Sequence, residues 1–83
     1  MNKAQIEKNI ALLNLLVNGP HPMIGLSRDS DAFKKAFECV SNPGEKVKID
    51  KMEELWNVEE ILNEIGVIVS ISKVNKAYYI VTI

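Results

Sequence analysis

The C-terminal stretch of the chain decides the fold: residues 50–83 read DKMEELWNVEEILNEIGVIVSISKVNKAYYIVTI. Residues 50–65 carry apolar side chains at helical spacing, and Gly66 suits the position after a helix end, where a left-handed backbone is often needed. Two apolar runs, residues 67–73 and 77–83, then predict strands joined by a short turn. This stretch therefore predicts a helix followed at once by a β-hairpin.

The helix in this stretch has two interpretations. Asp50 and Glu53 have the spacing of a capping box, in which two side chains bond to the free N–H groups of a helix start, and Asn57 and Glu60 repeat that spacing. The pattern fits one continuous helix, or two helices separated by a break near Trp56. The pattern does not place Trp56 on either side of the helix, but we expect it to complete the core, as a large aromatic residue does more often in a small domain.

The register of the hairpin follows from its apolar residues. A three-residue loop at residues 74–76 gathers six of them on one core face: Val67, Val69, Ile71, Tyr79, Val81 and Ile83. A two-residue loop at Asn75 and Lys76 would mix serines into that face, because a slip of one residue moves every side chain to the other side. The sequence therefore favours the three-residue loop.

The opposite face of the hairpin is more apolar than a solvated sheet needs. We expect a protein interface there, formed by Ile68, Tyr78, Ile80 and Thr82.

Upstream of this stretch the sequence predicts one more strand and two more helices. Residues 45–49 alternate polar and apolar side chains, which is typical of a short, half-buried edge strand. Residues 31–40 have an apolar face at helical spacing and follow several capping side chains. Residues 3–17 predict the first helix. The expected fold is a small α+β domain in which the helices at the N-terminus precede a strand, a helix and an antiparallel hairpin.

The first helix has an unusually broad apolar face. Ile6, Ile10, Leu13 and Val17 recur at helical spacing, and three more leucines widen the stripe: Leu12, Leu15 and Leu16. Such a face is more than one neighbouring helix covers. We expect this helix to be central to the core, because a small single domain needs such a helix; the alternative is that part of it contacts another chain.

Length and composition limit the function classes. With 83 residues, a hydrophobic fraction of 47% and a formal charge of −1, the chain resembles an ordinary globular domain, and we expect residues 1–83 to form one domain. Near-neutral charge gives no global attraction for nucleic acid. Cys39 is the single cysteine and His21 the single histidine, so neither an internal disulfide nor a paired metal or catalytic motif is present.

From these residues we expect a cytoplasmic protein with no membrane segment, no metal, no cofactor and no enzymatic activity. Cys39 is expected to be a structural, partly buried cysteine, and His21 a plain loop residue.

The order of elements from residue 31 onward resembles the outline of a winged-helix domain, with residues 74–76 as a very short wing. That resemblance implies a nucleic-acid-binding regulator, whose contacts would be Lys46, Lys48, Lys51, Lys73 and Lys76. The segment in the recognition-helix position, residues 58–65, carries three glutamates and no Lys or Arg, which opposes binding to phosphates.

The function that the sequence favours is a small intracellular protein-binding module: a regulator, inhibitor or assembly factor that acts through an apolar surface on the hairpin or the first helix. The alternative is the winged-helix-like transcriptional regulator. A homodimer is a further expectation, because a C-terminal strand at a sheet edge could pair with the same strand of a second copy.

Overall fold

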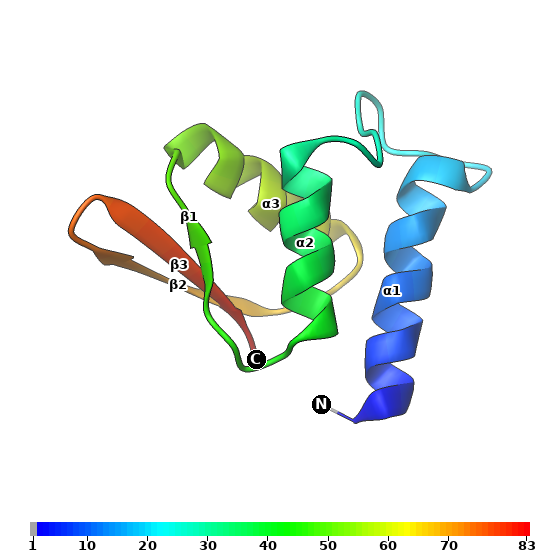
Figure 1. Ribbon diagram of the computed structural model, residues 1–83. Coiled ribbons are helices and arrows are strands. Elements are labelled where there is room, and N and C mark those ends of the chain that lie inside the picture. Colours follow the sequence, from blue (N-terminus) through cyan, green and yellow to red (C-terminus); the bar gives the residue numbers. More distant parts are fainter. Residues whose placement is uncertain (1) are drawn as a thin grey trace.

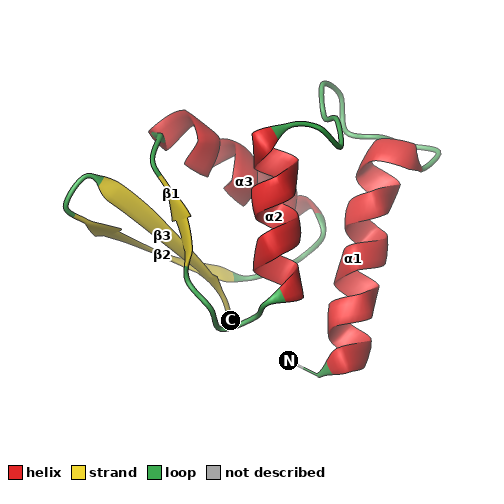
Figure 2. Cartoon of the chain, in the orientation of Figure 1, coloured by secondary structure: helices red, strands yellow, loops and turns green. Residues whose placement is uncertain are grey.

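The computed structural model describes residues 2–83, which form three helices and a three-stranded antiparallel sheet (Figures 1 and 2). The elements in chain order are α1 (Lys3–Asn18), α2 (Asp31–Ser41), β1 (Val47–Ile49), α3 (Met52–Glu64), β2 (Val69–Val74) and β3 (Ala77–Thr82). The predicted α+β fold with a C-terminal hairpin is confirmed.

The helices begin where side chains cap them, with one exception. The Asn2 side chain accepts a hydrogen bond from the Gln5 N–H at the start of α1, and the Ser30 hydroxyl accepts one from the Phe33 N–H at the start of α2. Among the described residues, no side chain caps α3 at its first turn, where Lys51 is the N-cap.

Both capping boxes expected in α3 are therefore wrong, and the helix is continuous from Met52 to Glu64. Asp50 lies one residue before the N-cap, and its carboxylate is 3.8 Å from the Lys48 Nζ at an exposed site. Trp56 lies within the unbroken helix and is 62% exposed, so the expectation that it completes the core is wrong.

The end of α3 follows the prediction. Gly66 has φ +77°, its N–H donates to the Asn63 carbonyl, and the Val67 N–H donates to the Leu62 carbonyl. These two bonds form a Schellman motif, and the buried side chains of Val67 and Leu62 supply its usual apolar contact.

Replacing Gly66 by alanine is expected to lower the free energy of unfolding by roughly 1–2 kcal/mol, because a left-handed backbone is costly for a residue with a Cβ. An added Cβ would meet no atom within 4 Å, so the cost comes from the backbone alone. Urea unfolding measures it. The matched variant Gly66→Asn should cost less, since asparagine tolerates this conformation. Equal stability of the wild type and Gly66→Ala would contradict the assignment.

The hairpin register differs from the prediction. Val74 pairs with Ala77, so the loop holds two residues, Asn75 and Lys76, rather than three. Asn75 has φ +58°, a conformation that two-residue hairpin turns require and that asparagine adopts readily. The turn and the apolar pattern of the strands thus favour different registers, and the structure has the register that the turn favours.

This register inverts the two faces of β3. Ile80 and Thr82 are buried, Tyr78 is half-buried against the core, and Ile83 is 73% exposed. The Thr82 hydroxyl donates to the Cys39 carbonyl at 3.1 Å, which satisfies a carbonyl in the last turn of α2. The outer face expected from the sequence is therefore wrong for Tyr78, Ile80 and Thr82.

The strand order is β1-β3-β2, so the C-terminal strand is central rather than an edge. Val47 pairs with Ile80 and Ile49 with Tyr78, which brings the apolar side of β1 onto the same face as the buried side of β3. The expectation that β3 offers an edge to a second copy is wrong, because both of its sides are already paired.

The core lies between this sheet and helices α2 and α3. Its buried apolar residues are Leu13, Phe33, Ala36, Cys39, Val40, Val47, Ile49, Leu55, Val58, Ile61, Leu62, Val67 and Ile80. Helix α1 lies beside α2 and packs mainly against it (Figure 1). Among the apolar residues of α1, Leu13 is the one that is fully buried. The first helix is therefore peripheral, and the expectation that it is central to the core is wrong.

Candidate functional site

A cleft runs between α1 and the connection from α3 to β2. Two neighbouring hollows form it, one of about 310 Å³ and one of about 170 Å³. The larger is lined by Leu12, Leu15, Leu16, Pro20, His21, Glu64 and Ile65. The smaller is lined by Gln5, Asn9, Gly66, Val67, Ile68 and Ile83. We call these two hollows together the α1 cleft.

The helical spacing of α1 explains why the cleft is apolar. Leu13 points into the core, while Leu12 and Leu15 lie on the neighbouring flank, which the rest of the chain leaves partly uncovered. Leu15 is 51% exposed. The broad apolar face of α1 thus divides into a stripe that packs on α2 and a stripe that lines the cleft.

The opposite wall of the cleft is created by the end of α3. The Schellman motif turns the chain sharply after Ile65. Ile68, which follows this turn, lines the smaller hollow together with residues of α1, and its side chain is 71% exposed. Ile83, at 73% exposure, lines the same hollow. Of the interface residues expected from the sequence, Ile68 is the one that reaches this cleft; Tyr78, Ile80 and Thr82 do not line it.

The charge at the cleft is negative on the α3 side. Glu64 lines the larger hollow and is exposed. The sequence of α3 contains five glutamates and no Lys or Arg, so its solvent-facing side is acidic along its whole length. A basic group on a binding partner would meet a favourable field at this rim.

The lysines expected to contact nucleic acid do not share one face. Lys48 pairs with Tyr79 across the sheet, and the Lys46 Nζ lies 6.0 Å from the centroid of the same ring, so both lie on the face away from the helices. The Lys73 Nζ lies 5.5 Å from the Tyr78 ring, which belongs to the helix-covered face. Lys51 precedes α3, and Lys76 is in the hairpin turn.

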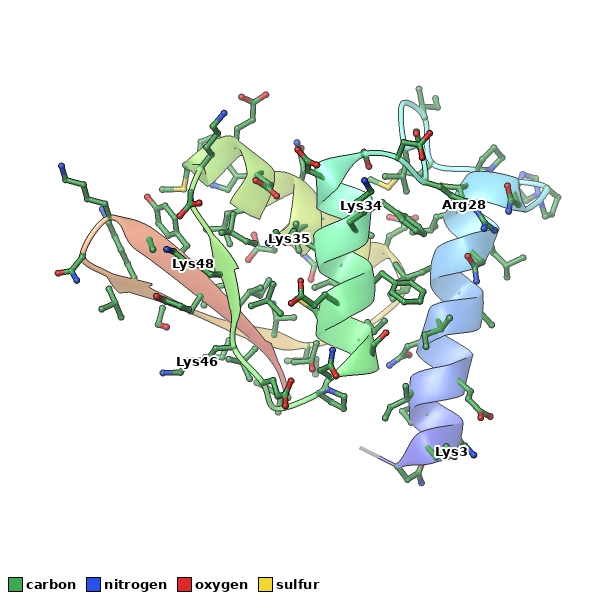
Figure 3. All side chains as sticks on the ribbon, in the orientation of Figure 1. Lys3, Arg28, Lys34, Lys35, Lys46 and Lys48 are labelled. Atoms are coloured by element: carbon green, nitrogen blue, oxygen red, sulfur yellow. The ribbon has the colours of Figure 1, made fainter. Side chains whose placement is uncertain are left out.

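Lys34 and Lys35 of α2 are two further basic residues that the sequence prediction of nucleic-acid contacts left out. Figure 3 shows Lys34 and Lys35 on α2 and Lys46 and Lys48 along β1. Glu38 and Glu45 separate the two pairs of lysines in the sequence, and Asp31 and Asp50 flank the group. The lysines therefore form no uninterrupted run of positive charge in the sequence.

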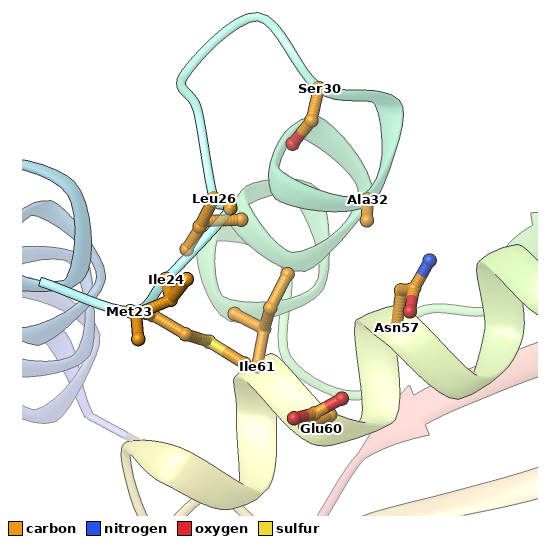
Figure 4. Close-up of a pocket in the computed structure, with 9 residues that line it drawn as sticks. Met23, Ile24, Leu26, Ser30, Ala32, Asn57, Glu60 and Ile61 are labelled. Atoms are coloured by element: carbon orange, nitrogen blue, oxygen red, sulfur yellow. The ribbon is translucent and has the colours of Figure 1, made fainter.

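A third hollow, of about 210 Å³, lies beneath the loop before α2 (Figure 4). The Met23 side chain reaches toward Ile61 of α3, and Leu26 packs beside it against the core. Ile24, which follows Met23 in this loop, is fully exposed. The polar residues at its margin are Ser30, Asn57 and Glu60, and the Ser30 hydroxyl is already engaged in capping α2.

Cys39 is buried, and its thiol is free. Burial raises the pKa of this thiol to about 12, with the Glu38 carboxylate acting in the same direction. The thiol is therefore neutral at physiological pH, which is the state of an unreactive structural cysteine.

His21 lines the α1 cleft and is far from Cys39 in the sequence. Within residues 2–83, no group of three or more His, Cys, Asp or Glu side chains is arranged to hold a metal ion.

None of the helices in residues 2–83 has the length and hydropathy needed to cross a bilayer. Comparisons with protein-family models, with curated proteins and with solved structures give no significant match. The resemblance to winged-helix domains therefore stays a prediction from the order of elements.

Proposed function

We propose that this chain is a small non-enzymatic protein-binding module, a regulator, inhibitor or assembly factor, that holds an apolar segment of a partner protein in the α1 cleft. One observation carries the proposal: Leu15 remains 51% exposed while lining a hollow of about 310 Å³. Apolar surface of this kind, concave and rimmed by polar groups, is typical of binding grooves.

The chemistry of the rim defines the partner segment. Leu12, Leu15 and Ile65 favour aliphatic or aromatic side chains, whose burial supplies most of the binding free energy. Glu64 and the acidic side of α3 favour Lys or Arg next to those side chains. The expected ligand is thus an apolar segment flanked by basic residues.

The compartment that fits this proposal is a reducing one. Cys39 is unpaired and buried, and the core packs around it without any disulfide among the described residues. We therefore retain the cytoplasm as the proposed site of action.

The test is affinity purification from nuclease-treated lysate of the native host, with bound proteins identified by mass spectrometry after low-salt and high-salt washes. We expect a protein that stays bound after nuclease treatment and whose yield falls at high salt, because salt screens the acidic rim. Recovery that depends on intact nucleic acid would instead favour the alternative regulator, with Lys46 and Lys48 as its first contacts to test. If neither protein nor nucleic acid is retained, the proposal fails.

A further inference from the structure

Strand β2 forms a free edge of the sheet, because within residues 2–83 it pairs with β3 alone. The side chains from Ser70 to Val74 are all exposed, and Val69 is half-buried. Exposed edge strands present unpaired N–H and C=O groups to other chains. This edge spans six residues, the typical length of a strand in a sheet.

The hydrogen-bond pattern shows which residues of β2 face the free edge. In a two-residue hairpin the residues that flank the turn, Val74 and Ala77, bond to each other, and bonding then recurs at every second residue. The Ile83 N–H donates to the Ile68 carbonyl at 3.0 Å, in agreement with this alternation. The odd-numbered residues therefore direct their N–H and C=O groups outward: Val69, Ile71 and Lys73.

Few features protect this edge from pairing. Strand β2 contains no proline or glycine, and its one charged residue is Lys73, whose Nζ lies near the Tyr78 ring. The opposite edge, β1, has three residues, and Lys46 and Lys48 accompany it. Pairing is thus favoured at β2 and opposed at β1, so an assembly that forms through β2 stops at two copies.

We propose that two copies of this chain associate through antiparallel pairing of their β2 strands, centred where Ile71 meets Ile71 of the second copy. This register places outward-bonding residues opposite one another, as an antiparallel ladder requires: Ile71 opposite Ile71, and Val69 opposite Lys73. The product is a continuous six-stranded sheet whose helices all lie on the same face, because the two-fold axis is normal to the sheet.

The side chains of β2 are complementary to themselves in this register. Ile68, which is 71% exposed, lies opposite Val74, which is 50% exposed, and this contact occurs twice. Ser70 lies opposite Ser72, also twice, and hydroxyl pairs of this kind stabilise sheets. No like charges meet, since Lys73 faces Val69. A shift of two residues in either direction separates Ile68 from Val74.

The test is sedimentation equilibrium of the full chain from about 10 μM to about 1 mM, a range suited to a small interface. Two double variants differ only in the charge at residue 70: Ser70→Lys with Ser72→Lys, and Ser70→Glu with Ser72→Lys. Both positions are exposed and lie in non-bonded pairs of the proposed ladder, where opposing side chains approach most closely. Circular dichroism establishes that each variant is folded.

We expect the wild type to be a dimer in reversible equilibrium with the monomer. The Lys/Lys variant should dissociate at least about tenfold more readily, because it creates two like-charge pairs, and the Glu/Lys variant should associate more tightly, because it creates two opposite-charge pairs. A wild type that stays monomeric at every concentration would overturn the proposal. So would a dimer whose dissociation constant is the same in both variants.

Discussion

Replacing Ile80 by alanine is expected to lower the free energy of unfolding by about 2–5 kcal/mol, the range measured for buried aliphatic residues truncated to alanine. Ile80 is fully buried and occupies the middle of the sheet, paired with Val47 on one side and Ile71 on the other. A small domain of this size has a total stability on the order of 4–12 kcal/mol. The variant should therefore lose a large share of its stability, as measured by urea unfolding at 25 °C followed by circular dichroism.

The matched control is Val81→Ala, on the opposite face of the same strand. Val81 pairs with Ser70 on the side of the sheet away from the helices and is half-buried, so we expect its loss to cost less than that of Ile80. The three-residue hairpin loop expected from the sequence makes the reverse prediction, because it puts Val81 in the core and Ile80 outside. A larger cost for Val81→Ala than for Ile80→Ala would contradict the observed register.

The second large effect concerns binding. Replacing Leu15 by lysine is expected to weaken binding of the partner at least thirtyfold, which corresponds to about 2 kcal/mol. The variant removes apolar surface from the larger hollow of the α1 cleft and would require an ammonium group to be desolvated when the partner binds. Fold stability should change little, because Leu15 is half exposed before binding. Isothermal titration of the purified partner gives the affinity.

Ile24→Lys is the control for this change, because it introduces the same side chain at an apolar residue that is already fully exposed and lies outside the α1 cleft. Its affinity for the partner should equal that of the wild type. A second variant, Glu64→Gln, should weaken binding less than Leu15→Lys and should reduce the dependence of affinity on salt, because it removes one charge from the rim. Equal losses in Leu15→Lys and Ile24→Lys would show that the effect is not specific to the cleft.

The local structure of the chain was predictable because it depends on local signals. The apolar spacing of α2, the alternation in β1 and the left-handed Gly66 each indicated the element that the structure contains. The first expected capping box failed because the N-cap of α3 is Lys51, one residue after Asp50. The spacing of Asp50 and Glu53 matches the motif, but Asp50 is not at the position from which it could cap the helix. The same spacing at Asn57 and Glu60 lies within the helix and caps nothing there.

The faces of the sheet were not predictable from the hairpin alone. The apolar pattern correctly put Val69 and Ile71 of β2 on the side of the helices, but for β3 it put the odd-numbered residues on that side, whereas the even-numbered ones lie there. Two interactions determine which residues of β3 face the helices. Asn75 adopts the positive φ of a two-residue turn, and β1 pairs with β3 over a long sequence distance, which brings Val47 opposite Ile80.

The sequence predicted that apolar residues of the first helix would form a contact surface, but it did not predict which other part of the chain would face them. The breadth of the apolar face on the first helix pointed to a second contact surface, and Leu15 belongs to it. The opposite wall, from Glu64 to Ile68, comes close to α1 only through tertiary packing. Ile68 was expected to act together with Ile80 on one sheet face, whereas the structure buries Ile80 and places Ile68 beside α1.

The most direct test of the proposed binding through the α1 cleft is quantitative capture from native lysate with three baits: wild type, Leu15→Lys and Ile24→Lys. The proposal predicts at least one protein that the wild type and Ile24→Lys enrich equally and that Leu15→Lys fails to enrich. Enrichment of the same proteins to the same extent by all three baits, or by none of them, would contradict it.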